Sequence, residues 1–197
     1  MDPDELGRIE VRFPWLGSTG DRDVRAWATL CTPYADDDQG LQALPEADSQ
    51  VLVAFEAGNW LRPYIIGSCW NGRASTARRP EAANNIRVLR SRSKSELEFD
   101  DTAGAAKVSL TMQSGHRVVL DEGTQEVTIQ HTNGSKVHLT AAGTIEVHAT
   151  LSVDVKASIV NVTAPVSIFS GIIQCKTLVA DTSVSSPLYT PGVGNLL

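Results

Sequence analysis

The C-terminal half of the chain alternates between apolar and polar residues over one short stretch after another. The clearest examples are Glu126–Gln130, Ser135–Thr140 and Thr144–Lys156, in which every second residue is apolar. A period of two is the pattern of a β-strand, and the glycines and small polar residues between the stretches are typical of turns. Residues 103–197 are therefore predicted to form a succession of short strands with almost no helix.

These strands are short of large side chains. From Gly104 onward Phe169 and Tyr189 are the only Phe, Tyr or Trp residues, and all four Trp lie in the first 70 residues. A single chain of such narrow strands buries too little apolar surface to offset the entropy that it loses on folding. Several identical chains wound around a common axis bury much more. The pattern thus predicts an intertwined β-prism, a rigid needle rather than an enzyme.

In a threefold needle, alternate side chains point toward the axis. One parity supplies the predicted trimer core, which consists of Val127, Ile129, Val137, Leu139, Ile145, Val147, Leu151, Val153 and Val155. His138 and His148 have the opposite parity and are expected to face solvent. His131 shares the inner parity, which leaves two alternatives. Three copies meet on the axis around an ion or water, or His131 is a solvated residue at the end of a strand.

The first 72 residues have a different pattern. The stretches Gly7–Phe13, Val24–Cys31, Gln50–Glu56 and Arg62–Ser68 each predict a strand, and Asp36–Gly40 predicts a turn. Several short strands within so few residues suit a small closed barrel of the oligonucleotide/oligosaccharide-binding (OB) type, since closure removes free strand edges. We therefore predict an OB barrel over 1–72, a connector or neck over 73–102, and a shaft with its tip over 103–197.

The connector is strongly basic. Between Asn71 and Ser95 lie seven of the seventeen Lys and Arg residues, and Glu81 is the only acid. One interpretation is a solvated linker that touches acidic loops of a neighbouring subunit. The other is a basic collar, formed by Arg87, Arg90, Arg92 and Lys94, that docks a hub protein. Nucleic-acid binding is disfavoured, because no aromatic residues are interleaved for base stacking and the net charge of the chain is −6.

Composition and motifs give little sign of chemistry. No apolar run is long enough for a membrane span, and the acidic N-terminus has no secretory signal. Cys31, Cys69 and Cys175 are widely spaced without a Cys-x-x-Cys pair, so we expect reduced, partly buried thiols and no zinc site. The sequence has no Gly-x-Ser-x-Gly elbow, His-Glu-x-x-His helix or phosphate-binding loop. We therefore expect no enzymatic activity, no cofactor and no metal.

Several segments in order carry a family resemblance. These are Gly7–Trp15, Arg25–Thr29, Gln50–Trp60 and Arg62–Gly72 in the first part of the chain, followed by Glu98–Gly104, Gly115–Gly123 and Tyr189–Leu197. The first group resembles the OB-fold domain of the phage baseplate assembly protein V and VgrG spike family. The later segments resemble, in turn, the entry to the β-helix, a shaft repeat and the blunt end of such spikes.

The resemblance implies an all-β protein in which an N-terminal OB-fold barrel is followed by an intertwined, trimeric β-helix spike. It implies the central spike of a contractile tail or injection machine, which lies below the tube and punctures the target envelope, with transient membrane contact, when the sheath contracts. The chain would be made and assembled in the cytoplasm and become part of a phage-like particle. Whether that particle is a phage, a bacteriocin or an injection system is left open.

The resemblance also implies partners. Few residues precede the barrel, so a separate hub protein is expected above it, among other baseplate and tail-tube proteins. Leu196 and Leu197 would form an apolar patch in a trimer, which predicts docking of a PAAR-type tip protein at Pro191, Val193, Leu196 and Leu197. The alternatives are a tip closed by its own apolar residues and a frayed tail. No His follows His148, so the His-x-His iron site of some short phage spikes is not expected.

Two other functions remain as alternatives at this stage. A receptor- or carbohydrate-binding trimeric tail fibre would need exposed aromatic grooves on the shaft. A cell-wall hydrolase attached to a spike would need a catalytic constellation, for which the sequence gives no motif.

Overall fold

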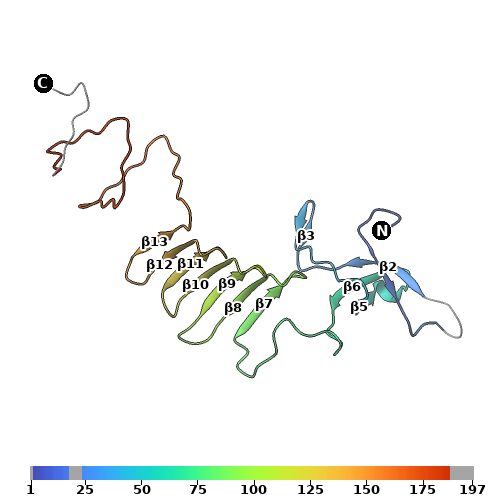
Figure 1. Cartoon of the computed structure of the whole chain (residues 1–197). Helices are drawn as coiled ribbons and strands as arrows, with labels where there is room; N and C mark the ends of the chain where they lie inside the picture. Colours follow the sequence, from blue (N-terminus) through green and yellow to red (C-terminus); the bar gives the residue numbers. More distant parts are fainter. Residues whose placement is uncertain (1, 18–23, 187–197) are drawn as a thin grey trace. The chain divides into compact units, whose positions relative to one another are not determined.

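The computed structural model describes residues 2–17 and 24–186 (Figure 1). In these residues the chain is all-β, with a single short 3-10 turn in place of any α-helix. The chain divides into two compact units, Met1–Ser152 and Val153–Leu197. All the strands of the described residues belong to the first unit. The strands, in chain order with the 3-10 turn η1, are β1 (Ile9–Arg12), β2 (Arg25–Leu30), β3 (Ala35–Asp36), β4 (Gln39–Gly40), β5 (Val51–Phe55), η1 (Glu56–Gly58), β6 (Pro63–Ser68), β7 (Ile86–Arg90), β8 (Glu96–Asp100), β9 (Lys107–Thr111), β10 (Arg117–Asp121), β11 (Glu126–Gln130), β12 (Lys136–Leu139) and β13 (Ile145–His148).

The N-terminal strands form a four-stranded sheet in the order β1-β2-β6-β5. Its β2–β6 pair is parallel and the other pairs are antiparallel. The buried core consists of Val11, Phe13, Ala28 and Ile65. Each of the strands predicted in this part of the sequence is confirmed, because each presents apolar residues to one side at the expected period.

An aromatic contact joins the two edges of this sheet. Phe13 directly follows the edge strand β1, and Phe55 ends the other edge strand, β5. Their ring centroids lie 5.9 Å apart, within the range in which aromatic rings attract one another. The chain therefore brings opposite edges together through side chains, as a small barrel requires.

The segment before β1 is held by one carboxylate. Asp2 accepts hydrogen bonds from the backbone N–H groups of Leu6 and Arg8, each at 3.0 Å, and from Nε of Arg8 at 3.1 Å. The hydrogen bond from the Arg8 guanidinium is the main reason that the pKa of Asp2 lies well below its ordinary value. This pairing fixes the turn through which the chain enters the barrel.

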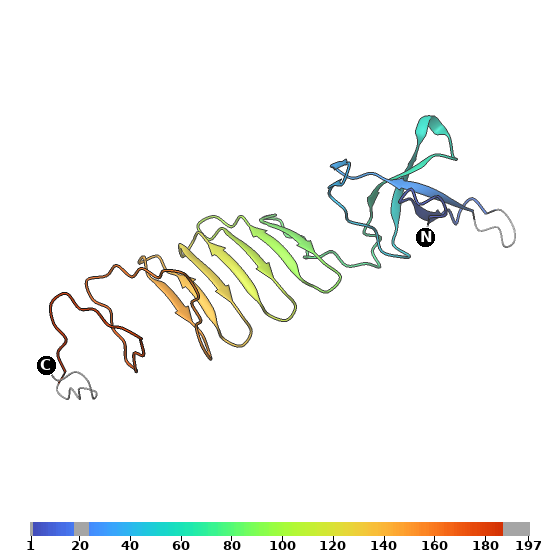
Figure 2. The same ribbon diagram turned by 90° about the horizontal axis from the view of Figure 1, so that it is seen from above.

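The second sheet is an antiparallel meander of seven strands, β7 to β13, which lie side by side in chain order (Figures 1 and 2). It begins at Ile86, so β7 and β8 lie inside the range 73–102 that the sequence assigned to the connector. β7 pairs with β8 along its whole length, with Arg87 opposite Phe99 and Arg90 opposite Glu96, while the domain boundaries themselves stay a prediction. The segment without strands between the two sheets is 69–85.

The turns after β7, β9, β11 and β12 share one hydrogen-bond pattern. In each, the first residue donates its N–H to the carbonyl of the fifth, and the fourth donates to the carbonyl of the first. The fourth residue has a positive φ, and it is Gly115 (96°), Gly134 (95°) and Gly143 (78°) in the last three turns. In the turn after β7 it is Lys94, with φ of 61°. A residue with a side chain costs about 1–2 kcal/mol in this region, whereas glycine does not.

Strand pairing within the chain ends at His148. The predicted alternation continues to Lys156, but residues 149–186 contain no strand. Large apolar side chains in this segment are exposed, with Leu151 96% and Ile172 98% accessible. The all-β class is thus confirmed in the described residues, where the single chain forms an open sheet followed by a segment without strands. The β-helix stays a prediction.

The shared turn geometry predicts a large effect for Gly115→Ala. The alanine would have to adopt a positive φ, and its Cβ would lie 3.2 Å from the Thr132 methyl carbon. We expect a loss of about 1–2 kcal/mol in the free energy of unfolding, measured by urea denaturation. The control is Gly67→Ala, where the φ is ordinary and a Cβ meets nothing within 4 Å. Equal effects of the two substitutions would contradict the argument.

Candidate functional site

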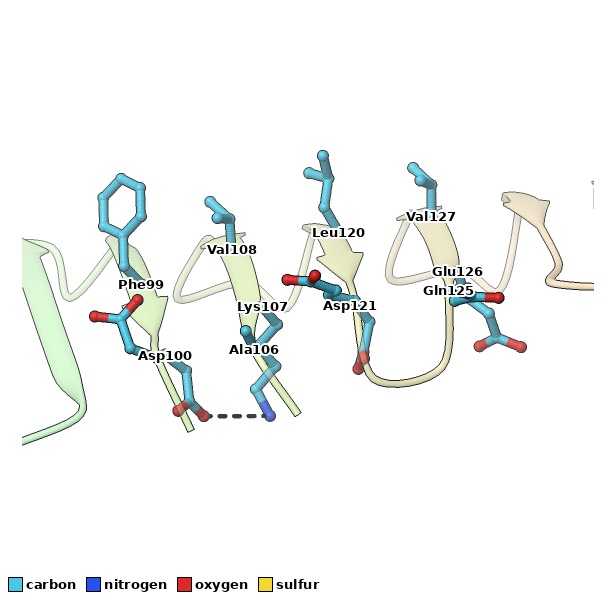
Figure 3. Close-up of a pocket in the computed structure, with 12 residues that line it drawn as sticks. Phe99, Asp100, Ala106, Lys107, Val108, Leu120, Asp121, Gln125, Glu126 and Val127 are labelled. Atoms are coloured by element: carbon cyan, nitrogen blue, oxygen red, sulfur yellow. Dashed lines mark ion pairs between the residues drawn. The ribbon is translucent and has the colours of Figure 1, made fainter. Parts of the chain in front are cut away.

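The seven-stranded sheet has one apolar and one polar face. Residues directly opposite each other on neighbouring strands share a face, and the register aligns the apolar ones in two rows across the strands. Figure 3 shows Phe99, Val108, Leu120 and Val127 pointing to the same side. One row consists of Phe99, Val108, Leu120, Val127, Leu139 and Ile145, and the other of Leu89, Leu97, Leu110, Val118, Ile129, Val137 and Val147.

Within residues 2–17 and 24–186, nothing covers this apolar face. Leu120, in the central strand, is 50% exposed, and Ile145 near the distal edge is 69% exposed. A shallow groove of about 410 Å³ runs over Phe99, Val108 and Leu120 and is bordered by acidic side chains of the adjoining turns (Figure 3). Contiguous exposed apolar surface of this kind marks an interaction site in soluble proteins.

The predicted trimer core falls into two groups. The structure brings Val127, Ile129, Val137, Leu139, Ile145 and Val147 together on the apolar face. Leu151, Val153 and Val155 lie beyond the last strand and are exposed. Sequence reasoning missed the continuation of the face through β7 to β10, although Val108-Ser-Leu110 and Val118-Val-Leu120 carry a weaker form of the same pattern.

Ion pairs cover the opposite face. Lys107 Nζ lies 3.7 Å from the Asp100 carboxylate (Figure 3), and Lys136 Nζ lies 3.4 Å from Glu146. Hydrogen bonds from Thr102 are the main reason that the pKa of Asp100 is lowered, and Lys107 adds to this effect. The face is polar and is suited to contact with water.

The histidines lie on this sheet and its turns. His138 is on the polar face, as expected, but is largely covered, with Nε2 3.5 Å from Glu126 and Nδ1 3.6 Å from Glu146. His131 lies in the turn after β11, where Nδ1 accepts a hydrogen bond from the Asn133 N–H at 3.1 Å. Its ring contacts that of His116 in a neighbouring turn, with centroids 4.3 Å apart and the ring planes inclined at 52°. Within one chain, His131 is therefore a turn residue.

One arginine ties the connector to the polar face. Arg78 donates from Nε to Glu98 at 2.7 Å and from Nη2 to Glu96 at 3.0 Å. Both carboxylates are largely buried, with side chains 13% and 16% exposed. Glu96 also accepts from Nε of Arg90 at 2.7 Å. The connector is thus fastened to the first hairpin of the sheet by a charged side chain that sequence reasoning had assigned to a solvated linker or collar.

The predicted basic collar is divided among several environments. Arg87 pairs with Asp101 at 3.0 Å, Arg90 pairs with Glu96, and Arg92 donates from Nε to Glu46 at 2.9 Å. Hydrogen bonding to Glu46 raises the pKa of Arg92. Lys94 has no side-chain contact in the described part of the chain. The collar as a hub-docking surface stays a prediction.

Other expectations concern the thiols, metals and the tip. The three cysteines are free, but they are exposed rather than partly buried, because they lie outside the strands and away from the small core. In the described ranges 2–17 and 24–186, no cluster of three His, Cys, Asp or Glu residues is arranged to hold a metal ion. Nor do these ranges contain a helix of the length and apolarity that crossing a membrane demands. The predicted tip residues Pro191, Val193, Leu196 and Leu197 lie outside the described residues.

Comparison with known proteins now adds to this geometry. Residues 1–70 match the family described as "Type VI secretion system/phage-baseplate injector OB domain". Over 134 residues the chain is 26% identical to the type VI secretion system spike protein VgrG3 of Vibrio cholerae serotype O1. The matched stretch is 65% of this chain and 13% of the relative. Over these residues the chain is similar to a VgrG spike protein. The expected resemblance to baseplate spike proteins is confirmed, and so is the OB class of the N-terminal part.

Two further relatives extend the comparison. The spike protein VgrG2a of Pseudomonas aeruginosa is 30% identical over 127 residues, which make up 57% of this chain and 14% of the relative. The "Actin cross-linking toxin VgrG1" of Vibrio cholerae is 28% identical over 116 residues, or 56% of this chain and 11% of the relative. This chain thus covers less than a sixth of the length of each of these three relatives.

The Arg78 contact predicts a measurable role in the neck. Arg78→Ala leaves Glu98 largely buried without its guanidinium, so we expect a loss of about 1 kcal/mol in stability and faster hydrogen exchange of amides in 73–85. Arg79→Ala is the matched control, since Arg79 has no side-chain partner within the described residues. If both variants exchange at the wild-type rate, the connector is not held by Arg78.

Proposed function

We propose that the chain is the central spike of a contractile injection machine and acts as a homotrimer. The observation that carries this proposal is the uncovered apolar face of the seven-stranded sheet, in a chain whose relatives are named as spike proteins. Three copies that turn these faces toward a common axis bury all three. The result is the β-prism expected from the sequence, with the predicted core residues of β11 to β13 at its centre.

The two-faced sheet suits a shaft. The outward faces carry ion pairs such as Lys136–Glu146, which keep the shaft soluble. No Phe, Tyr or Trp lies on the polar face of the described sheet, so a flat aromatic platform for sugar rings is lacking there. This favours the spike over the carbohydrate-binding fibre.

The distal segment fits the same arrangement. Between Ala157 and Ser186 only Lys176 and Asp181 carry charge, and apolar side chains are exposed throughout. Backbone without strand pairing and with such side chains needs hydrogen-bond and packing partners, which other chains could supply. We infer that residues after His148 form strands between the three copies and continue the shaft as an intertwined β-helix toward the tip.

The proposal includes the place of the spike in its machine. The barrel over 1–72 would sit at the baseplate below a hub protein and the tail tube, with a neck behind it and the shaft leading forward. Sheath contraction would drive the shaft through the target envelope, with a PAAR-type protein at its tip. The machine would be assembled in the cytoplasm as a phage-like particle, and the spike would act mechanically rather than as an enzyme.

The trimer can be tested with two adjacent residues of β10. Leu120→Asp places a carboxylate on the apolar face, and we expect the apparent dissociation constant of the trimer to rise at least about 100-fold, because three charges are buried at once. Val119→Asp makes a comparable change on the polar face and should leave the trimer intact. Sedimentation equilibrium measures both. Trimers of equal strength would contradict the inward placement of Leu120.

The role in the machine needs its own test. Contractile particles purified from cells that produce the chain should carry it at the end of the tube, as seen by electron microscopy with an antibody against the shaft. Deletion of the chain should leave particles that contract without permeabilising target cells. Particles that retain full activity without the chain would overturn the spike role.

A further inference from the structure

The turn after β7 departs from its counterparts at one position. The equivalent turns place Gly115, Gly134 and Gly143 where φ is positive, and this turn places Lys94 there. Other residues of the chain also tolerate a positive φ, but Lys94 is the one whose counterparts in the same turn geometry are glycine. A strained residue at a position that accepts glycine points to a role for its side chain.

The same turn already binds a carboxylate. Its sequence is Ser91-Arg-Ser-Lys-Ser95, and Arg92 donates to the Glu46 carboxylate. Hydroxyl groups hold its backbone in place, since Ser91 Oγ accepts from the Ser95 N–H at 3.2 Å and lies 3.0 Å from Ser93 Oγ. Lys94 is thus presented from a fixed turn beside a guanidinium that binds an acid.

A complementary acidic tip lies in the barrel. The β3–β4 hairpin carries Asp36, Asp37 and Asp38 without a basic residue. The Tyr34 hydroxyl donates to Gln39 across the hairpin at 2.7 Å, and Gly40 approaches the Tyr34 carbonyl so closely that a Cβ would lie 2.8 Å from it. The Asp37 and Asp38 carboxylates have no partner in the described part of the chain.

We propose that Lys94, together with Arg92, docks the Asp36–Asp38 hairpin of a second copy of this chain. The contact rests on the proposed trimer, in which it repeats around the axis and joins the barrel of one protomer to the shaft of its neighbour. It explains why lysine replaces glycine in this turn, and it gives the basic collar a partner within the assembly.

Charge reversal and rescue test the contact. The apparent trimer dissociation constant is measured at low salt, in urea near the wild-type midpoint. Exposed ion pairs contribute about twofold each, so Lys94→Glu is expected to weaken the trimer about tenfold through its three copies. Asp37→Lys should do the same, and the double variant should return to within about threefold of wild type. Raising the salt to 0.5 M should remove most of the difference.

Two further variants make the result decisive. Arg79→Glu changes the net charge equally in the same connector and should leave the trimer unchanged. Lys94→Gly relieves the backbone and removes the charge, so a weaker trimer supports docking, whereas an unchanged or tighter trimer overturns it. Failure of the double variant to rescue also overturns it. A wild type that is monomeric at every concentration overturns the proposed function as well, so the two failures are distinct.

Discussion

The uncovered apolar face of the seven-stranded sheet constrains everything else in this molecule. Side chains such as Leu120 and Ile145 lie on a surface that water would otherwise cover, and the hydrophobic effect favours any arrangement that removes them from it. The described residues offer little to cover them, since the buried core that they form is limited to the barrel. Assembly with copies of itself satisfies the constraint without any additional layer.

The polar face follows from the same constraint. A sheet that turns one side inward must meet water with the other, and the pairs Lys107–Asp100 and Lys136–Glu146 lie on that side. Arg78 holds the connector against the same face, at β8, the strand next to the edge strand β7. The fold therefore separates an assembly surface from a solvent surface within each strand, which is the arrangement that a slender shaft needs.

The sequence predicts best the features that depend on residues close together along the chain. Alternation alone identified β11 to β13 and the face that Val127, Val137 and Ile145 share, because a period of two fixes the side to which each residue points. It missed β7, where Leu89 directly follows Val88 and breaks the alternation. It also missed the Arg78–Glu98 pair, since a contact between residues twenty positions apart depends on how the chain folds back. In the sequence Lys94 is one charge among several, because the positive φ of its turn is a property of the backbone that the residue types do not reveal.

Similarity to known proteins and the geometry of the chain support one another. The injector OB match covers residues 1–70, where Phe13 and Phe55 contact each other between the two edge strands. The relatives are named as spike proteins, and the proposed assembly of several chains agrees with a sheet that leaves one face exposed in a single chain. The same assembly would give packing partners to the exposed apolar side chains of 149–186.

The most direct test of this account is the mass of the purified, full-length protein in solution, measured by multi-angle light scattering after size exclusion. The account predicts three times the chain mass of 21.1 kDa. A single chain mass over the whole accessible concentration range would contradict it, because the apolar face would then remain in water.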